Sequence, residues 1–355
     1  MSSGTFSTEN FRVLMAGSYD IDTYDRGRIL YKGLKMNGVD TELALNQGRG
    51  RHKRLASRLL QGGFDVVVVN GKPNLLVAWL LKPLHRKPIV FDVFISDFDT
   101  LVMDRRVVKQ GSLKASLLWW GDRIGCLLPD VIIHDTDEHV DYFVQAFGAR
   151  RSKFHVVPVG ADDTVFTPGN ARHRPFLVLF HGTYIPLQGT QHIIQAAKLL
   201  ERHEDIRFEL TGDGQMRSAA ENLAASLRLK NVTFKGMTTV ANLAADLRRA
   251  DAVLGIFGTT PKAQRVIPNK AYQCIAARKP LITADTPASR RVFSDGENAL
   301  LVPPGDARAI ADAVLRLRRD SRLAARIAAH GHGLFVERFT PRKIGARLSS
   351  IIKGR

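Results

Sequence analysis

The chain has 355 residues, of which 45% are hydrophobic, 24% charged and 8% aromatic. This length is enough for two domains of ordinary size, and the composition excludes a disordered chain or a coiled coil. The net charge of +18 is uneven, because residues 166–355 hold 30 Lys and Arg against 15 Asp and Glu. We therefore expect anionic partners such as nucleotide phosphates, an anionic acceptor, a lipid surface or nucleic acid. A solvated basic face without a partner would give the same charge.

The sequence carries no visible signal for export or membrane insertion. Cys126 and Cys274 lie in apolar stretches, which favours buried free thiols in a reducing compartment over a disulfide. The N-terminal stretch lacks a basic region before an apolar run, and no segment approaches the roughly 20 apolar residues that span a bilayer. We expect a cytoplasmic protein, and peripheral contact with an anionic membrane at its inner face stays open.

Apolar β-rich runs alternate with helical periodicity in both halves, which is typical of parallel sheets covered by helices. Strands are predicted at 11–17, 41–45, 64–70, 88–94, 130–135 and 154–159, and again at 175–182, 206–212, 231–236, 250–257 and 279–285. Prolines, glycines and an acidic pair between the two series indicate a linker. We predict an α/β protein with two doubly wound parallel-sheet domains, residues 1–167 and 168–340. A C-terminal helix over 341–355 is expected to cross back to the N-terminal domain, and the interdomain cleft is the expected site.

Two strand-to-helix junctions in the second half are rich in glycine. Gly182 closes a predicted strand and Gly189 opens an amphipathic helix, while Gly212 and Gly214 follow the next strand. Free backbone N–H groups at such junctions can receive a phosphate. Neither segment is a complete G-x-G-x-x-G or a P-loop, so support for a dinucleotide oxidoreductase or an NTPase is weak. Each pair would also fit an ordinary tight turn.

The segment 255–306 is the most informative part of the chain. A strand ends at Gly258, a basic loop with Lys262, Arg265 and Lys270 follows, and a short helix is predicted over 270–277. Cations beside a helix N-terminus form an electropositive pocket that suits a pyrophosphate.

Several pieces, in this order and spacing, resemble the retaining glycosyltransferases of family 4, which have the GT-B architecture of two facing Rossmann-like domains. The pieces are VVPVGADDTVFTPG, FHGTYIPLQGTQHIIQAAKLL, LTGDGQMR, NVTFKGMTT, ADAVLGIFG and CIAARKPLITADTPASRRVFSDGENALLVPPGD. The resemblance implies a hexosyltransferase that binds a nucleotide-sugar co-substrate in the second domain, needs no cofactor, and takes a carbohydrate or lipid-linked acceptor against the first domain. It implies donor contacts at Gly182, Gly189, Gly212, Gly214, Gly236 and Met237.

The chain departs from the family pattern at several donor-binding positions. Gln273 and Arg265 stand where family members usually have the two glutamates of an E-x7-E pair, and Thr183 and Gln188 stand where they place an arginine and a lysine on the diphosphate. Losing one charge-assisted bond costs about 1.5–3 kcal/mol. We therefore predict that Lys270 and Arg265, with Lys262 nearby, replace the missing cations, and that the amide oxygen of Gln273 accepts from the ribose.

On the acceptor side, the resemblance points to the turn after the first strand and the helix that follows it. Gly17 and Ser18 keep a small-residue turn, while Arg26 and Arg28 flank the single glycine that replaces a glycine pair. The two arginines are predicted to contact an anionic acceptor or the donor phosphate. A solvated helix N-terminus is the alternative.

Family members usually have a histidine or a carboxylate facing the reacting centre at the end of the fourth strand. Asp92 is our candidate for this catalytic position. The D-x-D strings Asp20/Asp22, Asp97/Asp99 and Asp135/Asp137 would bind a divalent metal in another glycosyltransferase fold, but their spacing is common and we interpret them as turn and cap residues. His134, His139 and His181 lack ligand spacing and are interpreted as surface or capping residues. No metal is predicted.

Residues 109–124 combine lysines with Trp119 and Trp120 in a predicted helix. Such a helix would suit a membrane interface. The alternative is that the tryptophans pack in the core or under the acceptor loop.

The sequence thus predicts a retaining glycosyltransferase that moves a sugar from a nucleotide donor to a glycan, lipid-linked or small-molecule acceptor. The missing carboxylates leave two alternatives on the same fold, a nucleotide-sugar epimerase and a non-catalytic sugar-nucleotide binder. Nucleic-acid binding rests on the charge alone, and no aromatic-plus-basic RNA motif or DNA-reading element supports it. We predict no nucleic-acid partner.

Overall fold

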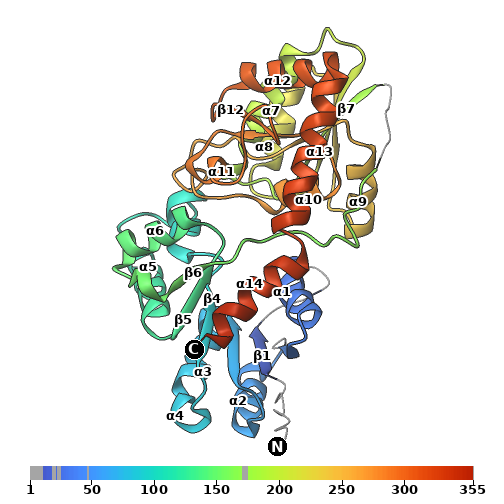
Figure 1. The fold of residues 1–355 in the computed structure, drawn as a ribbon. Helices are drawn as coiled ribbons and strands as arrows, with labels where there is room; N and C mark the ends of the chain where they lie inside the picture. The colour runs from blue at the N-terminus through green and yellow to red at the C-terminus, as the bar shows by residue number, and fades with distance from the viewer. Residues whose placement is uncertain (1–10, 18–20, 22–24, 46–47, 170–174, 355) are drawn as a thin grey trace, which may run out of the picture.

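The computed structural model describes residues 11–17, 21, 25–45, 48–169 and 175–354. Within them the chain forms two α/β domains, each built on a six-stranded parallel sheet (Figure 1). The predicted fold class of two doubly wound domains is confirmed.

The N-terminal domain places its strands in the order β2-β1-β3-β4-β5-β6. Its elements are β1 (Arg12–Gly17), α1 (Asp25–Met36), β2 (Asp40–Leu45), α2 (Arg51–Gln61), β3 (Val66–Asn70), α3 (Lys72–Leu80), α4 (Lys82–His85), β4 (Ile89–Asp92), the π-helix η1 (Asp99–Asp104), α5 (Leu113–Leu127), β5 (Val131–His134), α6 (Asp137–Phe147), the 3₁₀ turn η2 (Arg151–Lys153) and β6 (Phe154–Val156).

The C-terminal domain has the strand order β12-β11-β10-β7-β8-β9. Its elements are β7 (Phe176–His181), the 3₁₀ turn η3 (Pro186–Gln188), α7 (Thr190–Leu199), β8 (Ile206–Thr211), α8 (Arg217–Ser226), β9 (Val232–Lys235), α9 (Val240–Arg249), β10 (Ala252–Leu254), α10 (Asn269–Ala276), β11 (Leu281–Ala284), α11 (Pro287–Arg290), β12 (Leu300–Val302), α12 (Ala307–Arg319), α13 (Ser321–Arg338) and α14 (Pro341–Lys353).

Each predicted strand segment contains a strand, but β12 was not predicted. This edge strand has only three residues and is followed at once by Pro303 and Pro304, so it offers too short a run for periodicity to detect. Its pairing with β11 makes it a strand. That partner is distant enough in sequence that local patterns do not report it.

Both faces of the N-terminal sheet are buried, which explains its continuous apolar strands. Along β3, Val66 and Val68 join one core cluster, and Val67 and Val69 join the other. Helices α1 and α14 cover the first face, and α3 and α5 cover the second. Because all strands of this sheet are parallel, their carboxyl ends meet at one edge of the sheet, facing the other domain.

The last helix returns to the N-terminal domain and crosses α1 (Figure 1). The crossing is close because two glycines meet, and a Cβ atom on Gly33 would lie 2.2 Å from the carbonyl oxygen of Pro341. A Cβ on Gly345 would lie 2.0 Å from the carbonyl carbon of Gly33. Any larger side chain at either position would push the two helices apart, so α14 ties the C-terminal end of the chain to the first domain.

Cys126 and Cys274 are both free and buried, as predicted. Among the described residues, the helices are each too short or too polar to cross a membrane.

Candidate functional site

A pocket of about 380 Å³ opens between the two domains, at the carboxyl ends of strands in both sheets. The N-terminal domain lines it from the start of α1, the segment after β4 and the segment after β5. The C-terminal domain lines it from the loop after β7, the basic loop and the first turns of α10. Of the predicted donor-binding residues, the pocket lining includes Gly182, Thr183, Gln188, Lys270 and Gln273.

Lys270 is the buried cation of this pocket. Its side chain is 4% exposed, its Nζ donates to Gln188 Oε1 at 2.5 Å, and it lies 3.7 Å from the centre of the Phe180 ring. Burial alone places its pKa well below the ordinary value of 10.5. Among the described residues no carboxylate pairs with it, so an anion in the pocket would be its first opposite charge.

Gly182 allows Lys270 to reach this position. Its φ of 144° lies in the region that favours glycine, and a Cβ atom there would sit 2.9 Å from Lys270 Nζ. A larger residue would therefore both strain the backbone and displace the ammonium.

His181 adds a second polar group beside Lys270. The side chain is buried, and its Nε2 atom has no hydrogen-bond partner among the described residues. Burial, and then the nearby charge of Lys270, lower the pKa of His181 to about 3, so the imidazole is neutral at physiological pH. It can serve as a hydrogen-bond donor or acceptor to a ligand.

Asp25 brings a carboxylate to the pocket from the first turn of α1. Gln273 donates from Nε2 to Asp25 Oδ2 at 2.7 Å, across the domain boundary. Burial raises the pKa of Asp25, against the opposing effects of Arg28 and of hydrogen bonds from Asn269 and Gln273. The pocket thus holds a carboxylate opposite the position where the family's glutamate is replaced.

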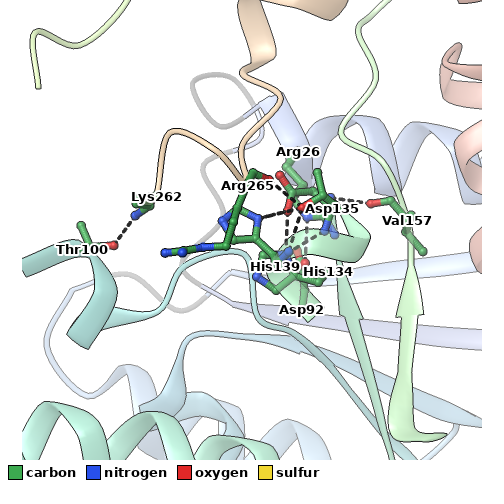
Figure 2. A network of polar contacts seen from close by, with 10 residues as sticks. Arg26, Asp92, Thr100, His134, Asp135, His139, Val157, Lys262 and Arg265 are labelled. Atoms are coloured by element: carbon green, nitrogen blue, oxygen red, sulfur yellow. Dashed lines mark hydrogen bonds and ion pairs between the residues drawn. The ribbon is translucent and has the colours of Figure 1, made fainter. Parts of the chain in front are cut away.

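The domains are joined over the pocket by polar contacts from η1 and its flanks. Lys262 Nζ donates to Thr100 Oγ1 at 2.6 Å (Figure 2), and Thr260 Oγ1 donates to Asp104 Oδ1 at 2.8 Å. Thr100 and Lys262 also line the pocket. These contacts fix the basic loop against the N-terminal domain.

Arg265 lies outside the pocket lining, contrary to the prediction that it binds phosphate. Its guanidinium donates to Asp99 Oδ1 at 2.6 Å and stacks 4.1 Å from the centre of the Tyr142 ring. Its carbonyl oxygen accepts from Thr136 Oγ1 at 2.8 Å. The arginine therefore anchors the basic loop to the first domain, and only tertiary packing supplied the carboxylate that captures it.

Asp92 and Arg26, predicted for catalysis and for anion contact, form a buried ion pair instead (Figure 2). Arg26 Nε lies 2.7 Å from Asp92 Oδ1, and Arg26 also donates to the carbonyl oxygen of Val157 at 2.9 Å. Both side chains are 1% exposed or less and neither lines the pocket. The geometry gives no support to a contact between Asp92 and the reacting centre. Arg26 is therefore neither free to contact an anion in the pocket nor part of a solvated helix N-terminus, the two interpretations made from the sequence.

Arg28 is also engaged within the protein. It pairs with Asp25 and lies 3.8 Å from Asp162 of the linker. Its effect on the pocket is therefore through Asp25. Gly17 ends β1 and does not line the pocket, and Ser18 lies outside the described residues.

Gly189, Gly212 and Gly214, three of the remaining predicted glycines, lie outside the pocket lining and pack closely against the backbone of neighbouring loops. A Cβ atom on Gly189 would lie 2.5 Å from the backbone of Phe257, and one on Gly212 would lie 2.0 Å from the carbonyl oxygen of Gly182. A Cβ on Gly214 would lie 2.7 Å from the carbonyl oxygen of Tyr184. These three glycines let neighbouring loops pack closely and do not line the pocket. Gly236 and Met237 are exposed outside it, and their predicted base contacts stay a prediction.

His134, Asp135 and His139 form a buried cluster, which corrects the interpretation of these histidines as surface or capping residues. Asp135 Oδ1 lies 2.6 Å from His134 Nδ1 and 2.8 Å from His139 Nδ1 (Figure 2). Burial, followed by the charge of His139, lowers the pKa of His134 to about 4. Burial opposes ionisation of Asp135, but the charge of His139 and the hydrogen bonds of both histidines outweigh it and lower its pKa.

The ligand atoms of this cluster lie within 4.8 Å of one another and could hold a metal ion, contrary to the argument from spacing. That argument missed them because β5 ends at His134 while His139 lies in the first turn of α6, and the strand-to-helix turn folds one over the other. The three groups already contact each other through hydrogen bonds, and the absence of a catalytic metal stays a prediction.

The aspartates of the D-x-D strings have separate partners. Asp97 pairs with Lys72, Asp99 with Arg265, and Asp137 with Arg151. Asp99 is buried and lies in the first turn of η1, and Asp20 and Asp22 lie outside the described residues.

Sequence reasoning did not assign to the site five polar residues that line the pocket from the first domain: Asp25, Thr100, Arg105, Asp135 and His139. Asp25 lies after the predicted strand 11–17 and Asp135 ends the predicted strand 130–135. They could have been selected because ligands bind at the carboxyl ends of parallel strands. Thr100 and Arg105 belong to a π-helix and its C-cap, for which no local pattern was visible.

Two facing Rossmann-like domains with a ligand-sized pocket between them are typical of the GT-B class. The C-terminal residues 175–320 match the model described as "Glycosyl transferases group 1", and residues 33–160 match "Glycosyl transferase 4-like domain". Together the two models span most of the chain. The chain belongs to the family 4 glycosyltransferases of the GT-B fold, which are enzymes.

Curated relatives are similar over most of the chain. A phosphatidyl-myo-inositol mannosyltransferase of Mycobacterium leprae is 28% identical over 79% of this chain and 71% of its own length. A D-inositol 3-phosphate glycosyltransferase of Corynebacterium efficiens is 25% identical over 84% and 72%. Some matches are partial, and the chain spans 57% of an MMP alpha-(1->4)-mannosyltransferase of Mycolicibacterium hassiacum.

Among solved structures, HepE of Anabaena in complex with UDP has the same fold. It superposes with a TM-score of 0.73 at 15% identity, over 97% of this chain and all of HepE.

Proposed function

We propose that the chain transfers a hexose from a nucleoside diphosphate sugar to a carbohydrate or lipid-linked acceptor, with retention of the anomeric configuration. The observation that carries this is Lys270, a buried cation aimed into the interdomain pocket without a carboxylate partner among the described residues. A buried lysine of this kind is costly unless a ligand supplies the opposite charge. A diphosphate in the pocket would do so.

The surrounding groups suit the two ends of such a donor. The backbone at Gly182 and Thr183, together with the neutral imidazole of His181, would contact phosphate oxygens beside Lys270. Gln188 would help to orient the ammonium, to which it is already hydrogen-bonded. Gln273 and Asp25 would contact hydroxyl groups of the ribose or of the transferred sugar, because amide and carboxylate oxygens accept hydrogen bonds from hydroxyl groups. HepE was solved with UDP-glucose, which supports a donor of this class.

The proposed step is a front-face displacement. The bond from the anomeric carbon to the diphosphate oxygen breaks, and the bond to the acceptor oxygen forms on the same face. The acceptor proton passes to the departing phosphate oxygen. Lys270 would stabilise the negative charge that develops on the diphosphate, which is an electrostatic role that needs no proton transfer from the protein.

A binding screen followed by product analysis tests this function. UDP, GDP, dTDP and ADP sugars are added to the purified protein, and selective binding raises its melting temperature by mass action. NMR of the product formed from the selected donor then reports the anomeric configuration. Inverted product would refute the retaining mechanism. Turnover of the donor without an acceptor would indicate an epimerase, and binding without any turnover would indicate a non-catalytic binder.

A further inference from the structure

Helix α5 presents an apolar stripe to solvent. Its outward residues recur with alternating spacings of four and three, so they lie along one face of the helix. They are between 46% and 79% exposed: Leu113, Leu117, Trp120, Ile124 and Leu127. A stripe of this length is normally buried against another element.

The opposite face of α5 packs against the N-terminal domain. The helix is therefore fixed in place, and its apolar stripe is exposed in the folded protein. Ala115 and Cys126 are buried, and Asp122 is buried against Lys72 at 2.5 Å. Trp119 donates from Nε1 to the carbonyl oxygen of Ala146 at 3.0 Å. The two tryptophans therefore differ, because Trp119 anchors the helix while Trp120 faces out.

Helices α3 and α4 carry further exposed apolar side chains. Helix α3 contacts α5 and covers the same face of the sheet. Exposed residues on α3 and α4 are Leu76, Trp79, Leu80 and Leu84, with exposures of 41% to 66%. We call these residues and the α5 stripe the α3–α5 surface. Figure 1 shows the three helices at the outer edge of the N-terminal domain.

Cations without an ion-pair partner lie near this surface, whereas the partly exposed carboxylates beside it, Asp97 and Asp130, are paired with Lys72 and Lys82. Arg86, Arg106, Lys109 and Lys114 are exposed and form no ion pair among the described residues. By contrast, the nearby carboxylates of η1 and α5 (Asp99, Asp104 and Asp122) are all buried. An apolar face with interfacial tryptophan and unpaired cations is complementary to an anionic bilayer. A second copy of this chain would instead bring the same cations together.

The surface is also connected to the pocket. Thr100 and Arg105 line the pocket, and Arg106, Lys109 and Leu113 follow them directly along the chain. A membrane held at α5 would therefore lie at the end of the segment that forms one wall of the site.

We propose that the α3–α5 surface docks this protein on an anionic lipid membrane. The apolar stripe enters the interface between headgroups and acyl chains, and the cations contact the lipid phosphates. Binding of this kind does not depend on glycosyl transfer or on a bound donor. The protein would then meet its acceptor at a membrane surface.

Vesicle co-sedimentation of the full chain tests the proposal. Wild type is expected to sediment with vesicles of phosphatidylcholine and phosphatidylglycerol, to bind phosphatidylcholine alone much less, and to detach as salt rises. Leu117→Gln with Trp120→Gln should weaken binding about tenfold or more, since two apolar side chains are lost from the interface. Lys109→Gln with Lys114→Gln should weaken it about 25-fold, at about fivefold per cation.

Two control variants separate docking from general effects. Leu199→Gln removes an exposed leucine of α7, and Lys230→Gln removes an exposed lysine of the C-terminal domain, so both should bind vesicles as wild type does. Lys270→Ala should bind vesicles fully even where donor binding is lost, so failure of the proposed function would not remove this result.

Circular dichroism confirms that each variant is folded. Equal vesicle binding by wild type and both double variants would overturn the proposal, as would no binding of wild type to phosphatidylglycerol vesicles. Sedimentation equilibrium that shows a dimer lost on Leu117→Gln with Trp120→Gln would assign the face to a second copy and also overturn it.

Discussion

Gln273 of α10 and Asp25 of α1 are joined by a hydrogen bond of 2.7 Å that crosses from one domain to the other. The contact places an amide at the position where the family has a glutamate, directly opposite a carboxylate of the first domain. A glutamate at 273 would face Asp25 as a like charge, which explains why an amide suits this pocket.

Gln273→Glu should therefore raise the KM for the donor on the order of tenfold. Repulsion between the two carboxylates that shifts a pKa by about one unit corresponds to about 1.4 kcal/mol, which is a factor of about ten in KM. The new carboxylate would also lie three residues from Lys270 and could pair with it, which further weakens phosphate binding. Adding Asp25→Asn should restore much of the loss, and steady-state kinetics on the two single variants, the double variant and Gln273→Ala measures this. A KM below wild type for Gln273→Glu would mean that the family's ribose contact persists and that the role of Lys270 needs revision.

Lys270→Ala should raise the Kd for the nucleoside diphosphate sugar about tenfold or more, because one charge-assisted contact contributes about 1.5–3 kcal/mol. Isothermal titration calorimetry measures the Kd, and thermal unfolding checks the fold. Lys230→Ala removes an exposed lysine and should leave the Kd unchanged. Unaltered affinity in Lys270→Ala would remove this lysine from the site.

At pH values near or above the lowered pKa of Lys270, donor binding should take up a proton. Burial holds the pKa of Lys270 well below 10.5 in the free protein, and a diphosphate favours the charged form. Donor affinity should therefore fall as pH rises above this lowered pKa, by at most about tenfold per pH unit for one proton. Calorimetry in two buffers with different ionisation enthalpies reports the uptake. The same uptake in Lys270→Met would show that another group takes the proton.

Asp92→Ala should lower the free energy of unfolding by about 3–5 kcal/mol, because the buried charge of Arg26 then lacks its carboxylate partner. Replacing both residues, as Arg26→Met with Asp92→Leu, should recover most of the loss. Denaturant unfolding measures both, with Asp40→Ala as the control, since the Arg12–Asp40 pair is more than half exposed and should contribute less than about 1 kcal/mol. A cost below that of the control would show that the buried pair is not a stabilising contact.

Transferase activity should survive EDTA, because the catalytic role proposed for Lys270 needs no metal. The cluster of His134, Asp135 and His139 makes this a real test, since its ligand atoms lie within 4.8 Å of one another. Complete loss of activity with EDTA, restored by manganese or magnesium, would contradict the expectation. His139→Ala would then show whether this cluster holds the ion.

The sequence by itself determined the two parallel-sheet domains and the class of the site. Apolar runs alternating with helices are local patterns, and the position of a cleft at the strand ends follows from parallel topology. It also selected Lys270, because a basic helix start after a buried strand is visible in the chain itself, whereas Gln188 and Gln273 were selected through the resemblance to the family. The order of the motifs shared with the family predicted that the protein is a glycosyltransferase.

Only the tertiary structure decided which polar side chains pair with one another and which stay available to a ligand. Arg265 is held by Asp99 and Arg26 by Asp92, partners that lie 166 and 66 residues away. Asp25 reaches Gln273 over 248 residues. A guanidinium or a carboxylate has the same sequence signature whether it binds a ligand or another side chain, since the difference lies in the charge that folding brings within a few ångströms. Which helix faces stay uncovered, as on α5, is decided in the same way, because burial depends on all elements that pack together.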